Sequence, residues 1–538
     1  MNRPARRARF GRWVLAMMTL LACVLIYYYF LPRLSESLPS PSPLLPAGAG
    51  EAKGEEPKEA SPAQVRRFCG MACHGYPPAE TFPRSAWRRE VKQAYDFFRN
   101  SKLAIDFPSQ ESVALYYESR APVELPFVEH AKPARPLPVS FKRKDYRMPA
   151  EPFHPAVSNV NLVHLFDPRR LDVLVCEMRL GQVLVLQPYE TKPTWKLLYS
   201  HGPDKGFNPA HAEVVDLDGD GIKDVLVANL GYFGPTDAPC GSVVWLCGLG
   251  DGRFQPYTLL DGVGRVADVQ AADFRGCGKL DLVVAAFGWR NTGEVIYLEN
   301  QTTDWTKPRF VPRVLDDRHG SIHVPVADLN GDGKPDFVAL ISQEHETIVA
   351  FLNEGKGFRK ETIWTAPHPA YGSSSIQLVD INGDGKLDVL YTNGDSLDPP
   401  FLLRPYHGVQ WLENQGLFPF QEHPLTSMYG VARAVAADFT GKGRKDILAV
   451  SLLTAEEYPR RKELQLDSII LLEQTAPGEF ARHSLETIAC DHFTCAAGDI
   501  YNDGRMHFVT GSCTLTGGAA INQAVTIWEN IKASTHKR

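Results

Sequence analysis

The chain lacks the features that most directly name a function. Ten cysteines among 538 residues are too few for a disulfide scaffold, although Cys240 with Cys247 and Cys490 with Cys495 could pair in an oxidising compartment. A net charge of -6 argues against a general nucleic-acid binder, because such a protein presents a basic patch. Neither a Gly-x-Ser-x-Gly elbow nor a phosphate-binding loop occurs, so no reaction is named by motif.

Long apolar runs are equally scarce, and the prominent one lies near the N-terminus. Residues 13–31 carry no charge, and the basic segment 1–12 before them contains five arginines. A run of this length spans a bilayer, and the arginines hold the N-terminus in the cytoplasm. We therefore predict a transmembrane anchor in the inner membrane, with the bulk of the chain periplasmic or otherwise extracytoplasmic. The alternatives are a cleaved signal peptide and a lipoprotein cleavage box at Leu20–Cys23.

The next segment, residues 32–64, is rich in Pro, Ala, Ser, Gly and Glu. Such a composition cannot bury a core, so we predict a disordered linker.

A cysteine pair followed by histidine comes after the linker, in Cys69-Gly-Met-Ala-Cys73-His74. The attachment signature of c-type haem is Cys-x-x-Cys-His, in which two thioethers hold the ring and the histidine ligates the iron. Here three residues separate the cysteines. Two helices are predicted downstream, and residues 65–130 resemble the cytochrome c-like domain found ahead of repeat domains in some bacterial exported proteins. The resemblance implies covalent haem c on Cys69, Cys73 and His74, and a role in electron transfer.

The sixth iron ligand has no clear source after the first helix of this segment. Met148, His130 and an open iron site are the candidates. Without haem, the cysteines would form a Cys69–Cys73 disulfide or part of a zinc site that lacks its fourth ligand.

The most specific pattern is a nine-residue acidic loop, Asp216-Leu-Asp-Gly-Asp-Gly-Ile-Lys-Asp224. Oxygen-bearing side chains at positions 1, 3, 5 and 9 suit calcium, which takes six to eight oxygens, and glycine at position 6 permits a sharp turn. An apolar strand follows, where an EF-hand would continue into a helix. Three complete copies predict calcium ligands at Asp216, Asp218, Asp220 and Asp224; at Asp328, Asn330, Asp332 and Asp336; and at Asp380, Asn382, Asp384 and Asp388.

Looser copies of the loop start at Asp273, Asp438 and Asp499, and a shortened one lies near Asp167. In two of the loose copies the acids are replaced by Arg275 and Cys277, or by Thr440 and Lys442, and Lys442 is predicted to place its ammonium where the ion would sit. We expect no metal there. For all copies, the alternative is that Asp-Gly hairpins are simply tight turns.

These copies make seven units, and six of them recur at a period of about 50 to 60 residues, a range typical of propellers and arrays. Each has an apolar strand, the loop, a second strand, a third strand such as Val295–Asn300 and a short fourth segment, which is the pattern of a propeller blade. These units resemble FG-GAP (VCBS-type) repeats and are similar to the integrin-alpha propeller. The resemblance implies a mainly β fold, a seven-bladed β-propeller over residues 137–531. The seventh unit lacks a fourth strand, and residues 138–147 are predicted to supply it and close the ring.

A set of polar residues stands five positions before the loops, on the predicted innermost strands. Side chains alternate between the faces of a strand, so these residues are predicted to line one end of the central channel. With neighbours that include His319, they could bind a ligand, a metal or a quinone cofactor; the alternative is a water-filled channel. The set comprises His211, Asp268, His323, Ser375, Arg433 and Thr494.

Three functions fit this sequence. The first is a membrane-anchored, calcium-stiffened propeller that binds a protein partner or a small ligand, with a haem domain for electron transfer. The second is an oxidoreductase with its substrate site at the propeller mouth. The third is an adhesion or scaffold protein with no redox role. A fusion of domains is analogy and does not choose among them.

Overall fold

The computed structural model describes residues 58–70, 75–101, 105–131, 133, 135–150, 153–202, 205–514 and 523–532. The predicted anchor (13–31), most of the predicted linker, Cys73 and His74 lie outside the described residues. None of the helices within these ranges combines the length and the apolar character needed to cross a membrane.

The N-terminal part of the described chain is helical. Ser61 and Gln64 form a reciprocal capping box at the start of the first helix, and Ser109 caps the last one by accepting the Ser112 N–H. The Trp87 ring stacks on the Tyr117 ring with 3.7 Å between centroids, and both side chains are buried. An aromatic core therefore joins the helices. The elements are α2 (Pro62–Cys69), η1 (Ala79–Thr81), η2 (Arg84–Ala86), α3 (Trp87–Ser101) and α4 (Gln110–Arg120).

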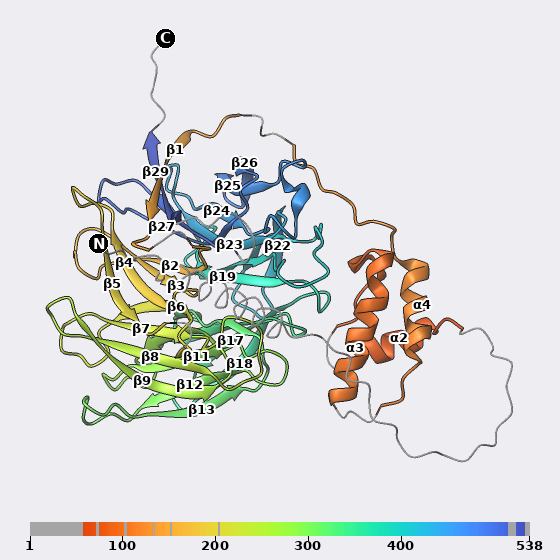
Figure 1. Cartoon of the computed structure of the whole chain (residues 1–538), viewed down its shortest axis with the longest axis horizontal. Coiled ribbons are helices and arrows are strands. Elements are labelled where there is room, and N and C mark those ends of the chain that lie inside the picture. Colours follow the sequence, from red (N-terminus) through yellow and green to blue (C-terminus); the bar gives the residue numbers. More distant parts are fainter. Residues whose placement is uncertain are drawn as a thin grey trace, which may run out of the picture. The chain divides into compact units, whose positions relative to one another are not determined.

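The rest of the described chain forms seven antiparallel sheets, the blades of a propeller (Figure 1). Blades 1 to 3 contain β2 (Val157–Val163), β3 (Asp172–Glu177), β4 (Gln182–Gln187) and β5 (Thr194–Ser200); β6 (Pro209–Val215), β7 (Asp224–Asn229), β8 (Gly241–Gly248) and β9 (Phe254–Val263); and β10 (Val266–Ala272), β11 (Asp281–Ala286), β12 (Glu294–Asn300) and β13 (Phe310–Asp316). Blade 4 contains β14 (Ser321–His323), β15 (Val326–Ala327), β16 (Asp336–Ile341), β17 (Thr347–Asn353) and β18 (Phe358–Thr365).

Blades 5 to 7 complete the set. They contain β19 (Ser373–Val379), β20 (Asp388–Asn393), β21 (Gly408–Glu413) and β22 (Gln421–Ser427); β23 (Val431–Ala437), β24 (Asp446–Ser451), β25 (Asp467–Ala476) and β26 (Glu479–Thr487), with η4 (Pro459–Arg461) inserted; and β27 (His492–Gly498), β28 (His507–Ser512), β29 (Gln523–Lys532) and β1 (Val139–Arg147).

The ring is closed by the strand predicted for that purpose. Strand β1 pairs antiparallel with β29, from Val139 opposite Lys532 to Arg147 opposite Gln523. Figure 1 shows the orange β1 beside the blue β29, so the two ends of the propeller share one blade. Closure removes an exposed sheet edge that would otherwise pair with other chains. The prediction of a seven-bladed propeller is therefore confirmed.

Burial along each blade follows from its position between two neighbours. Second strands such as β7, Asp-Val-Leu-Val-Ala-Asn, are buried at every residue. A sheet covered on both faces needs apolar side chains on both, which explains continuous Val/Leu/Ile runs in place of alternation. Outer strands such as β9 and β18 are only partly buried. Only the innermost strands and the loops are free to carry polar groups toward the channel and the two ends of the propeller.

Neither of these two possible disulfides is formed, and Cys240, Cys247, Cys490 and Cys495 are free thiols. Cys240 directly precedes β8 and Cys247 lies near its other end. Seven residues of extended chain span about 23 Å, whereas a disulfide needs Cα atoms within about 7 Å. Cys490 lies before β27 and its N–H donates to Ser468 Oγ at 2.8 Å, while Cys495 is buried within the strand.

Candidate functional site

The ninth position of the acidic loop joins three segments of a blade. It is the first residue of the second strand, as Asp224 is in β7. Asp224 accepts the N–H groups of Leu217 in the loop, at 2.9 Å, and of Gly248 at the end of the third strand, at 2.7 Å. Asp336 and Asp388 make the corresponding pairs of bonds in blades 4 and 5. This carboxylate therefore has a structural role in every complete copy, besides any contact with an ion.

The first and sixth positions shape the turn. Asp216 Oδ2 accepts the N–H of Gly221 at 3.0 Å, and Gly221 has a φ of 86°, which glycine adopts without strain. The same bond recurs in the loose copies, where Asp273 accepts from Gly278 and Asp438 from Gly443, each at 2.7 Å. Because intact and loose loops share this turn, the turn alone does not decide whether a cation can bind.

Blade 2 carries the least neutralised loop. One carboxylate oxygen from each of Asp216, Asp218 and Asp224 lies within 4.8 Å of the others. Asp216 Oδ1 is buried and has no hydrogen-bond partner among the described residues. Burial, reinforced by the neighbouring carboxylates, raises the pKa of Asp218 and raises that of Asp224 to about 6. A divalent cation at this point would relieve the repulsion.

Blades 4 and 5 hold a weaker version of the same arrangement. Position 3 is Asn330 or Asn382, which removes one negative charge from each loop. Position 7 is a lysine, and its Nζ lies 3.0 Å from Asp332 in blade 4 and 3.2 Å from Asp384 in blade 5. The side-chain bond from Lys334 lowers the pKa of Asp332. In blade 2 the residue at position 7 is Ile222, so Asp220 has no such competitor.

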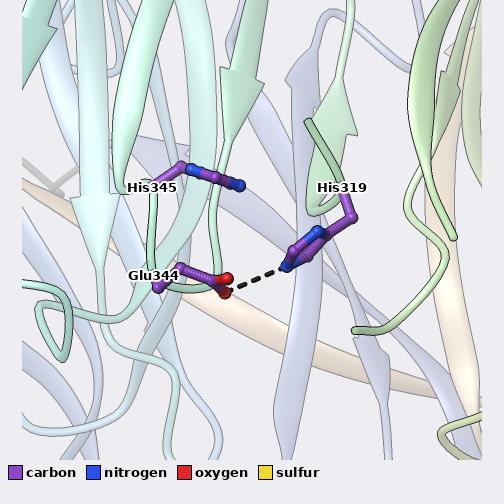
Figure 2. Close-up of side chains that lie close together, drawn as sticks. All are labelled: His319, Glu344 and His345. Carbon is purple, nitrogen blue, oxygen red and sulfur yellow. Dashed lines mark hydrogen bonds and ion pairs between the residues drawn. The ribbon is translucent and has the colours of Figure 1, made fainter. Parts of the chain in front are cut away.

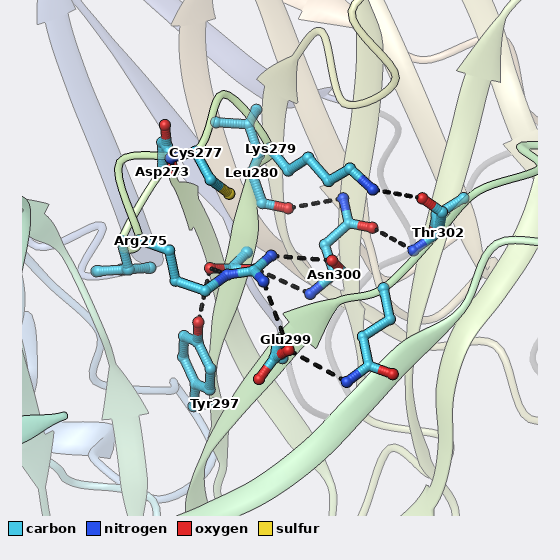
Figure 3. Close-up of polar contacts among 12 residues, drawn as sticks. Asp273, Arg275, Cys277, Lys279, Leu280, Tyr297, Glu299, Asn300 and Thr302 are labelled. Carbon is cyan, nitrogen blue, oxygen red and sulfur yellow. Dashed lines mark hydrogen bonds and ion pairs between the residues drawn. The ribbon is translucent and has the colours of Figure 1, made fainter. Parts of the chain in front are cut away.

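Blade 3 supplies its own cation (Figure 3). The Arg275 guanidinium, at position 3, makes two bonds of 2.9 Å to the buried Asp281 carboxylate. It also donates to the carbonyl oxygen of Asn300 at 2.9 Å. Tyr297 Oη donates to Asp281 at 2.6 Å, so this carboxylate is fully paired. In blade 3 the Arg275 guanidinium lies beside the ninth-position carboxylate, Asp281. The corresponding carboxylate of blade 2, Asp224, has no such cation beside it among the described residues.

The loose loops of blades 6 and 7 differ from that of blade 3 in the side chains that lie near their carboxylates. Lys442 Nζ bonds Glu473 at 2.5 Å, so the prediction that its ammonium takes the ion's place is wrong. Glu473 is buried on the third strand, and its carboxylate binds the Lys442 ammonium in place of the loop carboxylates. In blade 7, His507 stands at position 9 and its Nδ1 accepts the Asn530 N–H at 3.1 Å. Its Nε2 lies 3.2 Å from Asp503 Oδ1, and one ligand atom from each of Asp499, Asp503 and His507 lies within 4.8 Å of the others.

The predicted channel residues share one register in all blades. Each pairs with the second strand directly after a β-bulge, as His211 does with Ala228 and Asp268 does with Ala285. Each also lies thirteen residues before the ninth position of its loop. Counting from Asp172 in the same way adds Asn159, which the sequence interpretation missed because the loop of blade 1 is shortened. The polar ring, as we name it, comprises Asn159, His211, Asp268, His323, Ser375, Arg433 and Thr494.

Three members of the polar ring from consecutive blades contact one another. His211 Nδ1 lies 2.8 Å from Asp268 Oδ1, and His323 Nδ1 lies 3.8 Å from Asp268 Oδ2. Asp268 also accepts the Val324 N–H at 2.9 Å. Although burial acts in the opposite direction, the histidines hold the pKa of Asp268 well below its usual range.

On the other side of the polar ring, several polar atoms are unpaired. Asn159 Oδ1, Ser375 Oγ, Arg433 Nε and Thr494 Oγ1 are buried and have no hydrogen-bond partner among the described residues. Buried polar atoms normally find a partner in protein, water or ligand. The polar ring therefore combines an internally paired half with a half whose buried polar atoms have no hydrogen-bond partner among the described residues.

The helical part offers a poor setting for haem as it stands. Cys69, the last residue of α2, is a free thiol, and burial raises its pKa to about 11. Its side chain contacts the buried Tyr117, whose ring stacks on Trp87 and also contacts Tyr76 and Tyr116. Met148 packs in the core of blades 1 and 7, and His130 Nε2 lies 3.3 Å from Ser427 Oγ in blade 5. Met148 is therefore held in the propeller core, which disfavours it as the sixth iron ligand.

Comparisons with known proteins agree with the repeat pattern. Residues 216–284 and 328–391 match the FG-GAP-like repeat family. No curated protein matches the chain. Solved structures that it resembles include putative 6-phosphogluconolactonases from Bacteroides fragilis (TM-score 0.40, 15% identity, covering 60% of this chain and 84% of that one) and Bacteroides uniformis (TM-score 0.38, 14% identity, 61% and 86%). The BBS1N structure in complex with ARL6DN is another (TM-score 0.42, 8% identity, 73% and 98%).

At those scores the structural likenesses carry no conclusion about activity. The repeat match covers the loops of blades 2 to 5, which include the three complete acidic loops and the degenerate loop that starts at Asp273. The repeat match and the closed ring of seven sheets together show that this chain is a seven-bladed β-propeller that contains FG-GAP-like repeats.

Proposed function

We propose that this protein is a membrane-anchored, extracytoplasmic binding module whose propeller is stiffened by calcium. The observation that carries the proposal is the blade 2 loop, where three carboxylates converge and Asp216 Oδ1 is buried without a partner. In blade 3 the Arg275 guanidinium neutralises the buried ninth-position carboxylate, Asp281. Blade 2 has no arginine at the corresponding position, so we infer that a cation from solution neutralises its carboxylates.

Calcium suits the loop better than magnesium does. The ligands are carboxylate oxygens on a short turn, and calcium accepts six to eight oxygens with flexible geometry. Magnesium demands a near-ideal octahedron and keeps much of its water. The expected affinity is that of extracellular modules, a dissociation constant on the order of 10⁻⁴ to 10⁻³ M. Such an affinity matches calcium outside a cell, in agreement with the predicted anchor at residues 13–31.

The binding surface that we propose is the polar ring at the channel. Its paired half, His211, Asp268 and His323, is held in place by contacts between blades. Its unpaired half, which includes Ser375, Arg433 and Thr494, presents hydroxyl groups and one guanidinium. This combination favours a small polar or anionic ligand, or a loop of a partner protein that carries such a group. Nucleic acid is not expected, because the chain has a net charge of -6.

A calcium titration tests the proposal. We expect the purified chain to bind calcium by calorimetry, and its midpoint of thermal unfolding to rise by a few degrees in about 10 mM calcium, because a ligand at about 10 to 100 times its dissociation constant stabilises by roughly 1.4 to 2.7 kcal/mol. Asp218→Ala should lose the tightest calcium site, whereas Asp251→Ala, in an exposed turn of the same blade, should retain it. Equal binding by the two variants would contradict a calcium site in blade 2.

A further inference from the structure

Two histidines and a glutamate converge in blade 4, away from the acidic loops (Figure 2). His319 precedes the innermost strand β14, and Glu344 and His345 lie in the hairpin between β16 and β17. His319 Nε2 lies 3.0 Å from Glu344 Oε2, and the two imidazole rings are 5.0 Å apart, edge to face. One ligand atom from each of the three side chains lies within 4.8 Å of the others.

The loop that carries His319 is locked to the hairpin by its backbone. The Gly320 carbonyl oxygen accepts both the Ser342 N–H, at 2.8 Å, and Ser342 Oγ, at 2.9 Å. Gly320 has a φ of 91°, and a Cβ at this position would lie 2.8 Å from Ser342 O. Only glycine permits this close approach of the two backbones. The contact places His319 next to the hairpin, and a side chain at position 320 would break it.

The hairpin that carries the other two ligands is held in a strained turn. Gln343 and Glu346, which flank Glu344 and His345, adopt φ values of 58° and 41°. Such left-handed conformations of larger residues persist only where the surroundings enforce them, and they cluster at functional sites. Here the buried Glu346 carboxylate accepts the N–H groups of Gly372 and Ser373 at 3.0 Å and 2.9 Å.

We propose that His319, Glu344 and His345 bind one divalent transition-metal ion of the zinc class. Imidazole nitrogens select such ions, whereas calcium prefers an all-oxygen shell. Bonds of about 2.0 to 2.1 Å in a tetrahedron place ligand atoms about 3.3 to 3.4 Å apart, so each side chain needs to move by about 1 Å at most. Three protein ligands leave the fourth position to water, which is the arrangement of open zinc sites.

The exposure of the group allows an ion to enter. The His319 side chain is 16% exposed and that of Glu344 is 37% exposed, so solvent reaches the point between them. The acidic loops join the first and second strands of each blade, whereas His319 precedes the first strand and Glu344 follows the second. The two kinds of site therefore lie at opposite ends of antiparallel strands, and the zinc-class site does not depend on the calcium proposal.

The chain offers a matched control for this site. His423 Nε2 lies 3.0 Å from Glu413 Oε2, the same separation as in the His319–Glu344 pair. Among the described residues, however, no third histidine, cysteine, aspartate or glutamate completes a metal-binding group around His423. His423→Ala thus removes an equivalent histidine–carboxylate pair without touching the proposed site.

The test uses cobalt(II) as a visible probe and zinc as the competing ion, with the whole chain in excess calcium. We expect one equivalent of cobalt to give the visible absorption of a low-coordinate nitrogen–oxygen site, and one equivalent of zinc to abolish it. His345→Ala and Glu344→Gln should each weaken binding at least tenfold and remove that absorption, while His423→Ala should leave both unchanged.

Circular dichroism of each variant separates loss of the site from loss of the fold, and Glu344→Gln, which keeps the side-chain shape, serves if His345→Ala unfolds. Cobalt absorption that persists in both folded variants would overturn the proposal. So would its absence from the unaltered chain.

Discussion

His211 Nδ1 lies 2.8 Å from Asp268 Oδ1, and this contact ties the innermost strand of blade 2 to that of blade 3. His323 of blade 4 approaches the other oxygen of the same carboxylate at 3.8 Å. The two histidines respond differently to this shared partner. The pKa of His211 is raised by Asp268 and Glu213 despite burial and the repulsion of Arg433, whereas burial keeps the pKa of His323 below its usual value.

Replacing Asp268 with asparagine should therefore destabilise the propeller in a pH-dependent way. A histidine with a raised pKa contributes stability that is complete below its unfolded pKa, about 6.5, and disappears as the pH rises through its folded pKa. We expect Asp268→Asn to lower the free energy of unfolding by about 3 to 5 kcal/mol near pH 6, and by less at pH 8. Urea unfolding at both pH values measures the difference, and an equal loss at each would show that His211 is not the protonated partner.

The loops of blades 4 and 5 should bind calcium more weakly than the loop of blade 2, because lysine competes at position 7. Removing Lys334 frees Asp332, so Lys334→Ala should tighten calcium binding in blade 4 by a few-fold. Lys386→Ala should do the same in blade 5. Calorimetry of the two variants beside Lys279→Ala, which changes a lysine of the arginine-paired blade 3, separates this effect from a general change in charge.

Arg275 should be a structural residue that calcium cannot replace. Its partner Asp281 is fully buried, and Arg275→Met leaves that carboxylate with Tyr297 and the Asn300 N–H only. We expect a loss of about 2 to 3 kcal/mol, measured by urea unfolding, and no rescue by added calcium. Arg359→Met is the control, because Arg359 pairs with Glu354 in an exposed position, where such a pair contributes at most about 1 kcal/mol.

Closure of the ring can be tested by moving the start of the chain. A chain that begins at residue 137 keeps β1, whereas one that begins at residue 148 exposes the edge of β29. We expect the shorter chain to unfold at a lower temperature and to aggregate, because an unpaired edge templates other strands. Identical melting curves and identical monomer fractions in gel filtration would show that the seventh blade does not need its fourth strand.

Haem attachment at Cys69, Cys73 and His74 stays a prediction, and the described residues sharpen its test. Residues 58–70 and 75–129 contain no histidine or methionine, and His130 Nε2 lies beside Ser427 Oγ of blade 5, so of the candidates for the sixth position we expect the open iron site. We therefore expect a high-spin reduced spectrum from chain matured with a haem-attachment system. A spectrum without haem bands would remove the electron-transfer role, and a low-spin spectrum would require a ligand from beyond these residues.

The local signals in the sequence were sufficient for the architecture. The acidic loop, with its aspartates and glycines, is a turn stabilised by hydrogen bonds within nine residues, so its recurrence located the blades. The strands beside it are continuous apolar runs, which only a sheet buried on both faces requires. Even closure was predictable, because a unit without its fourth strand needs one from elsewhere.

Contacts between residues far apart in the sequence could not be predicted in the same way. Whether a loop holds an ion depends on which cation lies beside it: Arg275 remains at the carboxylate, whereas Lys442 turns to Glu473 on another strand. The register that adds Asn159 to the polar ring appears only once strand pairing fixes the bulge in every blade. Met148 is a plausible iron ligand by position and a core residue by packing.

The seven repeats of a hairpin with a buried sheet could be predicted from the sequence, because each is formed within a few residues along the chain. The return of residues 138–147 to the last sheet could be predicted because the seventh unit lacks a fourth strand. Where charge is neutralised and which side chains meet became known from the folded chain, in which His319 contacts Glu344, 25 residues further along the sequence. Those contacts depend on bringing separate strands to the same end of a sheet, and no periodic pattern encodes that distance.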